Sequence, residues 1–340
     1  MFLKKERDTV KQCRRDTLLI GGALLLLLLS FFLSLRLGST RISAADFWGA
    51  LLGRESARSA ALILRALRLP RALAGLFAGV GLALSGSLLQ HATDNPLAAP
   101  NVLGINAGAG FFVIAAMAIF PTAFAIYPLA AFLGAMLSAL LILGVSAKAH
   151  MGRTAIVLCG VALSALFGAG ISFFSVLDAD LLASYTDFSV GGLRGVTMGE
   201  LWSPMAIILL CLIGAMLLCR QLTLFCLGDS LAHSLGVSVK RVRLLALLLA
   251  AASAAAAVSF AGLLGFVGLL VPHTARRLSG NRLRTELLLS PMGGGILLLL
   301  ADLVGRMLFS PTEVPVGIFT ALLGVPFFIF LLLGGRNRHA

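Results

Sequence analysis

The sequence predicts an all-α protein built from many membrane-spanning helices. Of its 340 residues, 59% are hydrophobic and only 12% are charged, and the mean hydropathy is +1.02. So much apolar surface cannot be covered inside one water-soluble domain and requires surrounding lipid. The net charge of +13 comes from basic residues in short segments between apolar runs, a pattern that indicates membrane orientation rather than nucleic-acid binding.

The chain divides into a basic tail over residues 1–16, a single transmembrane domain over residues 17–335 and a short tail over residues 336–340. The first uncharged run, Leu18–Leu35, is about long enough to cross a bilayer. Its basic-then-apolar order resembles a signal peptide, but the run is long and no small-x-small cleavage site directly follows it. We therefore expect an uncleaved first span that enters from the cytoplasm.

Five further spans are expected before residue 220. Residues 72–147 are almost free of titratable side chains and leave room for three spans, separated near residues 94–100 and 121–128. The fifth span is Thr154–Leu177 and the sixth is Leu201–Cys219, with an acidic outer loop and one short helix between them. Small residues spaced by four, which predict close helix packing, are Gly75/Gly79, Gly81/Ser85 and Gly160/Ser164/Gly168.

The last four spans complete a set of ten. The apolar stretch between Arg243 and Arg276 has basic flanks on both sides, so it should go out and return as two short helices of roughly 24 Å each. The reversal is expected to reach the outer surface near Leu264. Its glycines are Gly262, Gly265 and Gly268. The ninth span ends at about Phe309 and the tenth covers residues 316–335, which leaves both termini in the cytoplasm.

The polar segment 228–236 interrupts two long apolar runs within the loop 227–240. Asp229 can cap a helix, Gly236 can take the left-handed conformation after a helix end, and Leu227, Leu231 and Leu235 fall on one helical face. These residues predict one or two amphipathic turns on the cytoplasmic side. From the loop alone, a solvated connector and a docking element remain equal alternatives.

No catalytic or cofactor-binding motif is present. The sequence lacks GxxxxGK[ST], HExxH and GxSxG, and its spans contain no cluster of carboxylates. We therefore expect a protein that is not an enzyme, holds no cofactor and takes any ATP-derived energy from a partner. The cysteines show no paired spacing, so we infer neither disulfides nor a metal site. They are Cys13, Cys159, Cys211, Cys219 and Cys226.

Two groups of charged residues lie where charge is unusual in a membrane protein. Asp302 and Arg306 lie four residues apart within an apolar run and predict a helix ion pair near the outer end. Residues 36–71 hold seven arginines on the side expected to be outer, against the usual orientation bias. Arginines there could anchor the second span at the lipid headgroups. His273, after Pro272, is interpreted as a surface or helix-end residue.

A series of motifs recurs in a known order over residues 60–335. The first half contains Arg68-Leu69-Pro70-Arg71, Ser85-Gly86, Gln90 and Asn95-Pro96-Leu97-Ala98-Ala99-Pro100. The second half contains Leu227-Gly228-Asp229, Ser234-Leu235-Gly236-Val237, Gly265-Phe266-Val267-Gly268, Pro272-His273, Ala301-Asp302 and Glu313-Val314-Pro315-Val316-Gly317. Together they resemble the permeases of the ferric-siderophore, heme and cobalamin ABC importers.

The resemblance implies an inner-membrane permease that forms a pore with a second permease, either a copy or a paralogue. It also implies two cytoplasmic ABC ATPases and an external substrate-binding protein. A ferric siderophore is the first-ranked cargo, and heme or cobalamin is the alternative within the family. From other classes, an ion-coupled secondary transporter would need more charged midplane residues, and a membrane enzyme would need a recognisable catalytic constellation.

Three groups of residues take roles from the resemblance. Coupling to the ATPase falls on Gly228, Asp229, Ser230, Leu231, His233, Leu235 and Gly236. Docking of the binding protein falls on Arg68, Arg71 and Arg306, which would explain the outer arginines. The structural motif residues are Asn95, Pro96, Gly265, Gly268, Pro272, Asp302 and Pro315. Ser230 and His233 depart from the family, which often has an acidic residue and an arginine there.

Overall fold

The computed structural model describes residues 2–335 except 39, 41, 149–152, 226–228 and 309–311. Within these residues all regular secondary structure is helical. The helices are α1 (Phe2–Arg36), α2 (Ala44–Leu51), η1 (Glu55–Ala57), α3 (Arg58–Ile63), η2 (Leu64–Arg68), α4 (Leu69–Thr93), α5 (Ile105–Ile119), α6 (Ile126–Lys148), α7 (Arg153–Leu177), α8 (Ala179–Val190), α9 (Met198–Phe225), α10 (Asp229–Ser234), α11 (Val239–Ala261), α12 (Val267–Ser279), α13 (Leu283–Leu308) and α14 (Val316–Gly335).

Seven helices in the described part of the chain are long and apolar enough to cross a membrane. They are Arg14–Arg36, Glu55–Thr93, Ile126–Val145, Leu158–Leu177, Met198–Phe225, Val239–Ala261 and Leu283–Leu308. Two shorter apolar helices, Ile105–Ile119 and Val316–Phe330, accompany them. The prediction of an all-α polytopic membrane protein is confirmed, while the count of ten crossings stays a prediction.

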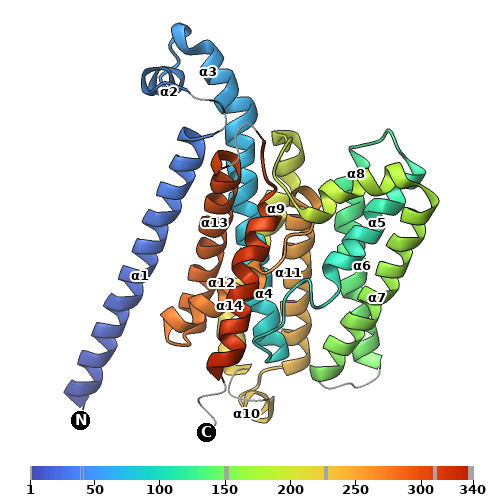
Figure 1. Cartoon of the computed structure of the whole chain (residues 1–340). Coiled ribbons are helices and arrows are strands. Elements are labelled where there is room, and N and C mark those ends of the chain that lie inside the picture. The colour runs from blue at the N-terminus through green and yellow to red at the C-terminus, as the bar shows by residue number, and fades with distance from the viewer. Residues whose placement is uncertain are drawn as a thin grey trace.

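Helices α4, α11 and α13 form the centre of the bundle (Figure 1). In an apolar segment of 18 residues within the helical stretch Glu55–Thr93, which includes α4, 78% of the residues are buried. The corresponding share is 72% in α11 and only 11% in the peripheral helix α1. The central helices approach closely because small residues face one another: a Cβ on Gly79 would overlap the backbone carbonyl of Gly294. Of the small residues expected to pack closely along α7, Gly160 does so against the backbone of Leu103, whereas nothing in this chain lies within 4 Å of a Cβ on Gly168.

The two ends of the bundle differ in character. Figure 1 places α10, the first turn of α1 and the last turn of α14 at one end, and α2 and α3 at the other. We call these the α10 end and the α2 end. This agrees with the expected position of both termini on the side of the 228–236 segment. Which end faces the cytoplasm remains the prediction made from the charge distribution.

The region 36–71, characterised from the sequence only by its arginines, is largely helical. Ser43 caps α2 by accepting a hydrogen bond from the backbone amide of Asp46 at 3.0 Å. A continuous helical stretch then runs from Glu55 to Thr93, so the second span does not begin at residue 72. A π-helical segment, η2, interrupts it at Leu64–Arg68. Such segments are commonly found at functional sites, because they redirect side chains locally.

The helix pair expected between Arg243 and Arg276 is asymmetric. Helix α11 has 23 residues and α12 has 13, so the prediction of two equally shortened helices is wrong. The basic residues at the start of α11 belong to the helix itself, which therefore begins before Arg243. Leu264 itself is only 3% exposed, so its side chain is not accessible at the surface, while the position of the turn relative to the membrane stays a prediction. The turn is attached to α8 by the Leu263 amide, which donates to the Phe188 carbonyl at 3.1 Å.

Candidate functional site

The α2 end contains a cluster of arginines and carboxylates drawn from distant parts of the chain. Arg71 on α4 donates to Asp302 on α13, with Nη2 2.9 Å from Oδ1 and Nε 3.0 Å from the same oxygen. Its Nη1 lies 2.7 Å from Oε2 of Glu313, in the segment before α14. Arg306 completes the cluster, with Nε 3.0 Å from Oδ2 of Asp302. The predicted ion pair between Asp302 and Arg306 is therefore confirmed.

Arg68 and Arg306 fasten the end of α1 to this cluster. Arg68 donates to the backbone carbonyls of Leu35 and Arg36, both at 2.8 Å. Arg306 donates to the hydroxyl of Ser34 at 2.9 Å. These carbonyls lie at the C-terminal turn of a helix, where backbone oxygens lack intrahelical partners and attract cations.

The side chains of the predicted docking arginines point into the protein and are not exposed on its surface. Arg68 is 5% exposed, Arg306 is 3% exposed and the Arg71 side chain is 15% exposed. They line a depression of about 380 Å³ together with Arg194 and Glu313. The exposed basic residues nearby are Arg54, Arg58, Arg65 and Arg194. Docking of a binding protein at this end stays a prediction. The positive charge exposed at this end comes mainly from these four arginines and not from the three that the resemblance identified.

Pro315 lies at the start of α14 where the chain returns to the cluster. The Val314 amide donates to the Gly305 carbonyl at 3.2 Å, and the Gly317 amide donates to the Gly191 carbonyl at 3.1 Å. A Cβ on Gly317 would overlap the carbonyl of Val190, so only glycine allows this approach. These contacts hold Glu313 against Arg71.

Helix α10 projects from the α10 end between α9 and α11 (Figure 1). Leu231 and Leu235 are each 55% exposed, while Ala232 between them is fully buried and holds the helix against the bundle. Gly236 has a φ of +81°, so the predicted left-handed residue after the helix end is confirmed. Leu227, Gly228 and the side chains of Asp229, Ser230 and His233 lie outside the described part of the chain.

A second buried ionic network near the α10 end was missed from the sequence. Glu286 on α13 is fully buried and accepts from Arg276 on α12, with 3.1 Å between Oε2 and Nε. Its Oε1 lies 3.0 Å from Nε2 of His91 on α4. Gln90 extends the network by donating to the Gly268 carbonyl at 3.3 Å. Two features of the sequence could have indicated it. Glu286 is a single carboxylate in the first turn of an apolar helix, and His91 is a single histidine in another.

The remaining motif residues shape this same region. The Asn95 side chain accepts from the Leu97 amide at 2.9 Å and closes a turn that contains Pro96. Gly268 lies so close to Gly86 that a Cβ on Gly86 would overlap its carbonyl. Pro272 is buried within α12, and the neighbouring His273 ring packs edge-on against Phe327. Nothing lies within 4 Å of a Cβ on Gly265, and the structure gives no reason for glycine there.

Comparison with known proteins identifies the family. The model of the FecCD transport family matches residues 26–334. The chain belongs to this family. An Fe(3+)-citrate import system permease of Bacillus subtilis is 36% identical over 96% of this chain and 98% of its own length. The hemin transport system permease of Yersinia pestis is 35% identical over 95% of this chain and 97% of its own length.

Structural comparison leads to the same assignment. A solved metal-chelate type ABC transporter in an inward-facing conformation superposes with a TM-score of 0.83. It is 29% identical, and the match covers 93% of this chain and 98% of that one. The resemblance inferred from the motifs is therefore confirmed, and the chain is a multi-pass membrane permease of an ABC importer family.

Proposed function

We propose that the chain is the permease subunit of an importer that moves a ferric chelate across the cytoplasmic membrane. It alternates between outward-open and inward-open states, and a partner ATPase supplies the energy. Relatives are named for ferric citrate, ferric hydroxamate and ferric enterobactin, which supports a ferric siderophore or citrate as cargo. One relative is named for hemin, so heme is the alternative within the family.

The observation that supports ATP coupling best is the exposed face of α10. Leu231 on α10 and Leu235 in the turn that follows it are both half-exposed outside the bundle. Apolar residues presented in this way suit a groove on a partner protein, where they become buried on contact. The proposed coupling segment is Gly228, Asp229, Ser230, Leu231, His233, Leu235 and Gly236. In an importer with two permease subunits, each subunit would present this segment to one of the two ATPases.

Replacement of Leu231 and Leu235 by serine tests this role. Both side chains are half-exposed, so their loss should leave insertion and stability unchanged while it removes substrate-stimulated ATP hydrolysis by the assembled importer in proteoliposomes. The matched control is the Leu51→Ser/Leu52→Ser variant, whose leucines are 57% and 69% exposed on α2 at the other end. Full coupling in the α10 variant would exclude α10 as the docking element.

The substrate is tested separately by uptake of radioactive iron. Deletion of the gene should abolish uptake of one class of ferric chelate, supplied as citrate, hydroxamate or catecholate complexes, and leave heme uptake intact. Loss of heme uptake alone would favour the heme alternative. Uptake that collapses with the ion gradient while ATP is maintained would instead indicate a secondary transporter.

A further inference from the structure

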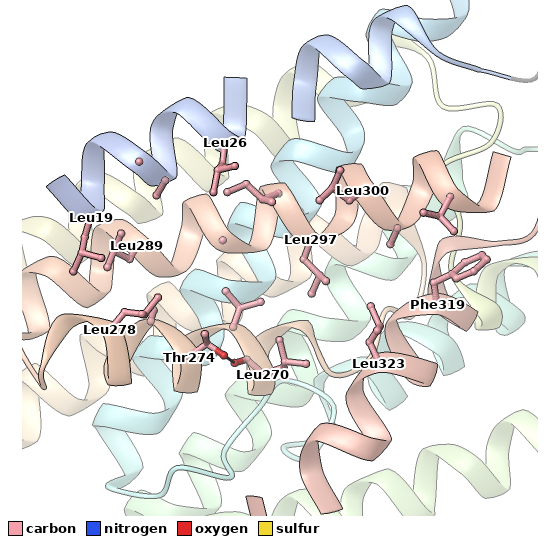
Figure 2. A pocket seen from close by; sticks show the side chains of 18 of the residues that line it. Leu19, Leu26, Leu270, Thr274, Leu278, Leu289, Leu297, Leu300, Phe319 and Leu323 are labelled. Atoms are coloured by element: carbon pink, nitrogen blue, oxygen red, sulfur yellow. Dashed lines mark hydrogen bonds between the residues drawn. The ribbon is translucent and has the colours of Figure 1, made fainter. Parts of the chain in front are cut away.

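A long apolar groove lies between the peripheral helix α1 and helices α12, α13 and α14. It has a volume of about 790 Å³. Figure 2 shows side chains from all four helices directed into it, among them Leu26, Leu270, Leu297 and Leu323. Along α13 its walls extend from Leu289 to Val304, which at 1.5 Å per residue is roughly 22 Å. The groove therefore follows most of the hydrocarbon thickness of a bilayer.

The chemistry of the walls excludes a polar occupant. The lining is aliphatic except for Phe319 and Thr274. The Thr274 hydroxyl already donates to the backbone carbonyl of Leu270 at 2.9 Å, as the dashed line in Figure 2 shows. A ferric chelate carries many polar oxygens, and burying these without hydrogen-bond partners would be unfavourable. The buried part of the occupant must therefore be hydrocarbon.

The mouth of the groove at the α10 end is basic. Arg14 and Arg15 lie one helical turn before the lining residues Leu18 and Leu19 on α1, and both are exposed. The Arg15 Nη2 donates to the carbonyl of Leu278 at 3.2 Å and so stands where α1 meets α12. Arg277 is also exposed and precedes Leu278 in the chain.

Among the side chains described around the mouth, the charged neighbours of these three arginines are engaged elsewhere. Asp16 is the only carboxylate in residues 12–36 of α1, and it is bonded to Arg282 and accepts from the Thr285 hydroxyl at 3.1 Å. Arg276 is directed to Glu286. A hydrocarbon groove that opens onto exposed arginines at membrane depth matches a lipid with apolar chains and a negatively charged headgroup.

We propose that this groove is a binding site for an anionic phospholipid. One acyl chain lies between α1 and α12–α14, and the phosphate faces Arg14, Arg15 and Arg277. The bound lipid fills the space that α1 leaves beside the bundle and links the helix to it. The arginines therefore select the lipid headgroup in addition to any effect on membrane orientation.

The test is native mass spectrometry of the full-length chain titrated with phosphatidylglycerol or phosphatidylcholine of identical acyl chains. Wild type should retain phosphatidylglycerol at least about tenfold more tightly, because each arginine near a headgroup is worth roughly a fivefold change in affinity. The Arg14→Gln/Arg15→Gln/Arg277→Gln variant should lose this preference but keep phosphatidylcholine binding. The corresponding lysine variant should retain the preference.

A second pair of variants tests the groove itself. Nothing lies within 4 Å of a Cβ on Gly22, which lines the groove, or on Gly21, which does not. Gly22→Phe should therefore occlude the groove and weaken binding of both lipids, whereas Gly21→Phe should bind as wild type. Wild-type binding by Gly22→Phe, or a persistent preference in the glutamine variant, would overturn the proposal. So would a Gly22→Phe chain that loses only its pairing with a second permease, because the groove would then be a protein interface.

Discussion

At the scale of single residues, the buried charges form two closed networks that fix helix ends. Asp302 pairs with Arg71 and Arg306 at the α2 end. Glu286 pairs with Arg276 and His91 near the α10 end. The sequence predicted only the Asp302–Arg306 pair, because its spacing is local to one helix. The partners in the Arg71–Asp302 pair are 231 residues apart, and no periodic pattern links such positions.

The Glu286 network predicts an asymmetric response to substitution. Arg276→Gln should destabilise the protein by about 3–5 kcal/mol, because it leaves a fully buried carboxylate with only His91 beside it. Glu286→Gln should cost less, about 1–3 kcal/mol, because the Arg276 side chain is 23% exposed and its guanidinium can turn toward water. The measurement is thermal unfolding of the purified variants in one detergent.

A double variant distinguishes ion pairing from simple packing. Arg276→Leu/Glu286→Leu removes both charges and keeps apolar volume, so it should be more stable than Arg276→Gln. If the stability lost by the double variant instead equals the sum of the stabilities lost by Arg276→Leu and Glu286→Leu alone, the two residues act independently and the network assignment fails.

At the scale of helices, apolar length predicted most spans and small residues predicted part of their packing. The boundaries of α7 and α14 and the end of α13 lie within a few residues of those expected. The prediction was wrong for α11 and α12, because basic residues were taken to end a span, whereas here they occupy the first turn of α11 itself. The π-helical segment η2 was not predicted; it ends at Arg68, whose carbonyl partner Leu35 is 33 residues away and is indicated by no local pattern.

The packing of α4 on α13 gives a prediction with an internal control. Gly79→Ala should destabilise the protein by about 1–3 kcal/mol, because its Cβ would overlap the Gly294 carbonyl and push the two helices apart. Gly168→Ala should be neutral or stabilising by about 0.4–1 kcal/mol, because it meets open space and reduces the freedom of the unfolded chain. Unfolding temperatures compare the two directly, and equal losses would show that backbone contact does not limit the α4–α13 distance.

At the scale of the molecule, the two ends separate the two expected partners. The α10 end carries half-exposed leucines, which suit a packed protein contact, and the α2 end carries exposed arginines, which suit electrostatic steering. The family resemblance identified Arg68, Arg71 and Arg306 as docking residues. Their burial changes how docking can be tested, since reversal of Arg68 or Arg306 would place a carboxylate against backbone oxygens inside the chain.

Charge reversal at exposed positions tests docking without this damage. Arg65 is exposed on η2, and Arg194 is exposed at the rim of the depression that also contains Arg71. The Arg65→Glu/Arg194→Glu variant should fold normally and associate more slowly with the external binding protein, because long-range attraction brings the partners together. Exposed pairs contribute only about 0.2–1 kcal/mol each, so the main change should be in association rate.

Salt dependence and position give the decisive comparison. The effect of the double reversal should be large at low ionic strength and small near 1 M salt, where the screening length falls to about 3 Å. The control is Arg220→Glu/Arg241→Glu, which makes the same change in net charge at exposed positions on α9 and α11. If both variants slow association equally, only net charge matters. If neither does, the arginines of the α2 end serve the fold and the headgroup region alone, and the binding protein docks by other contacts.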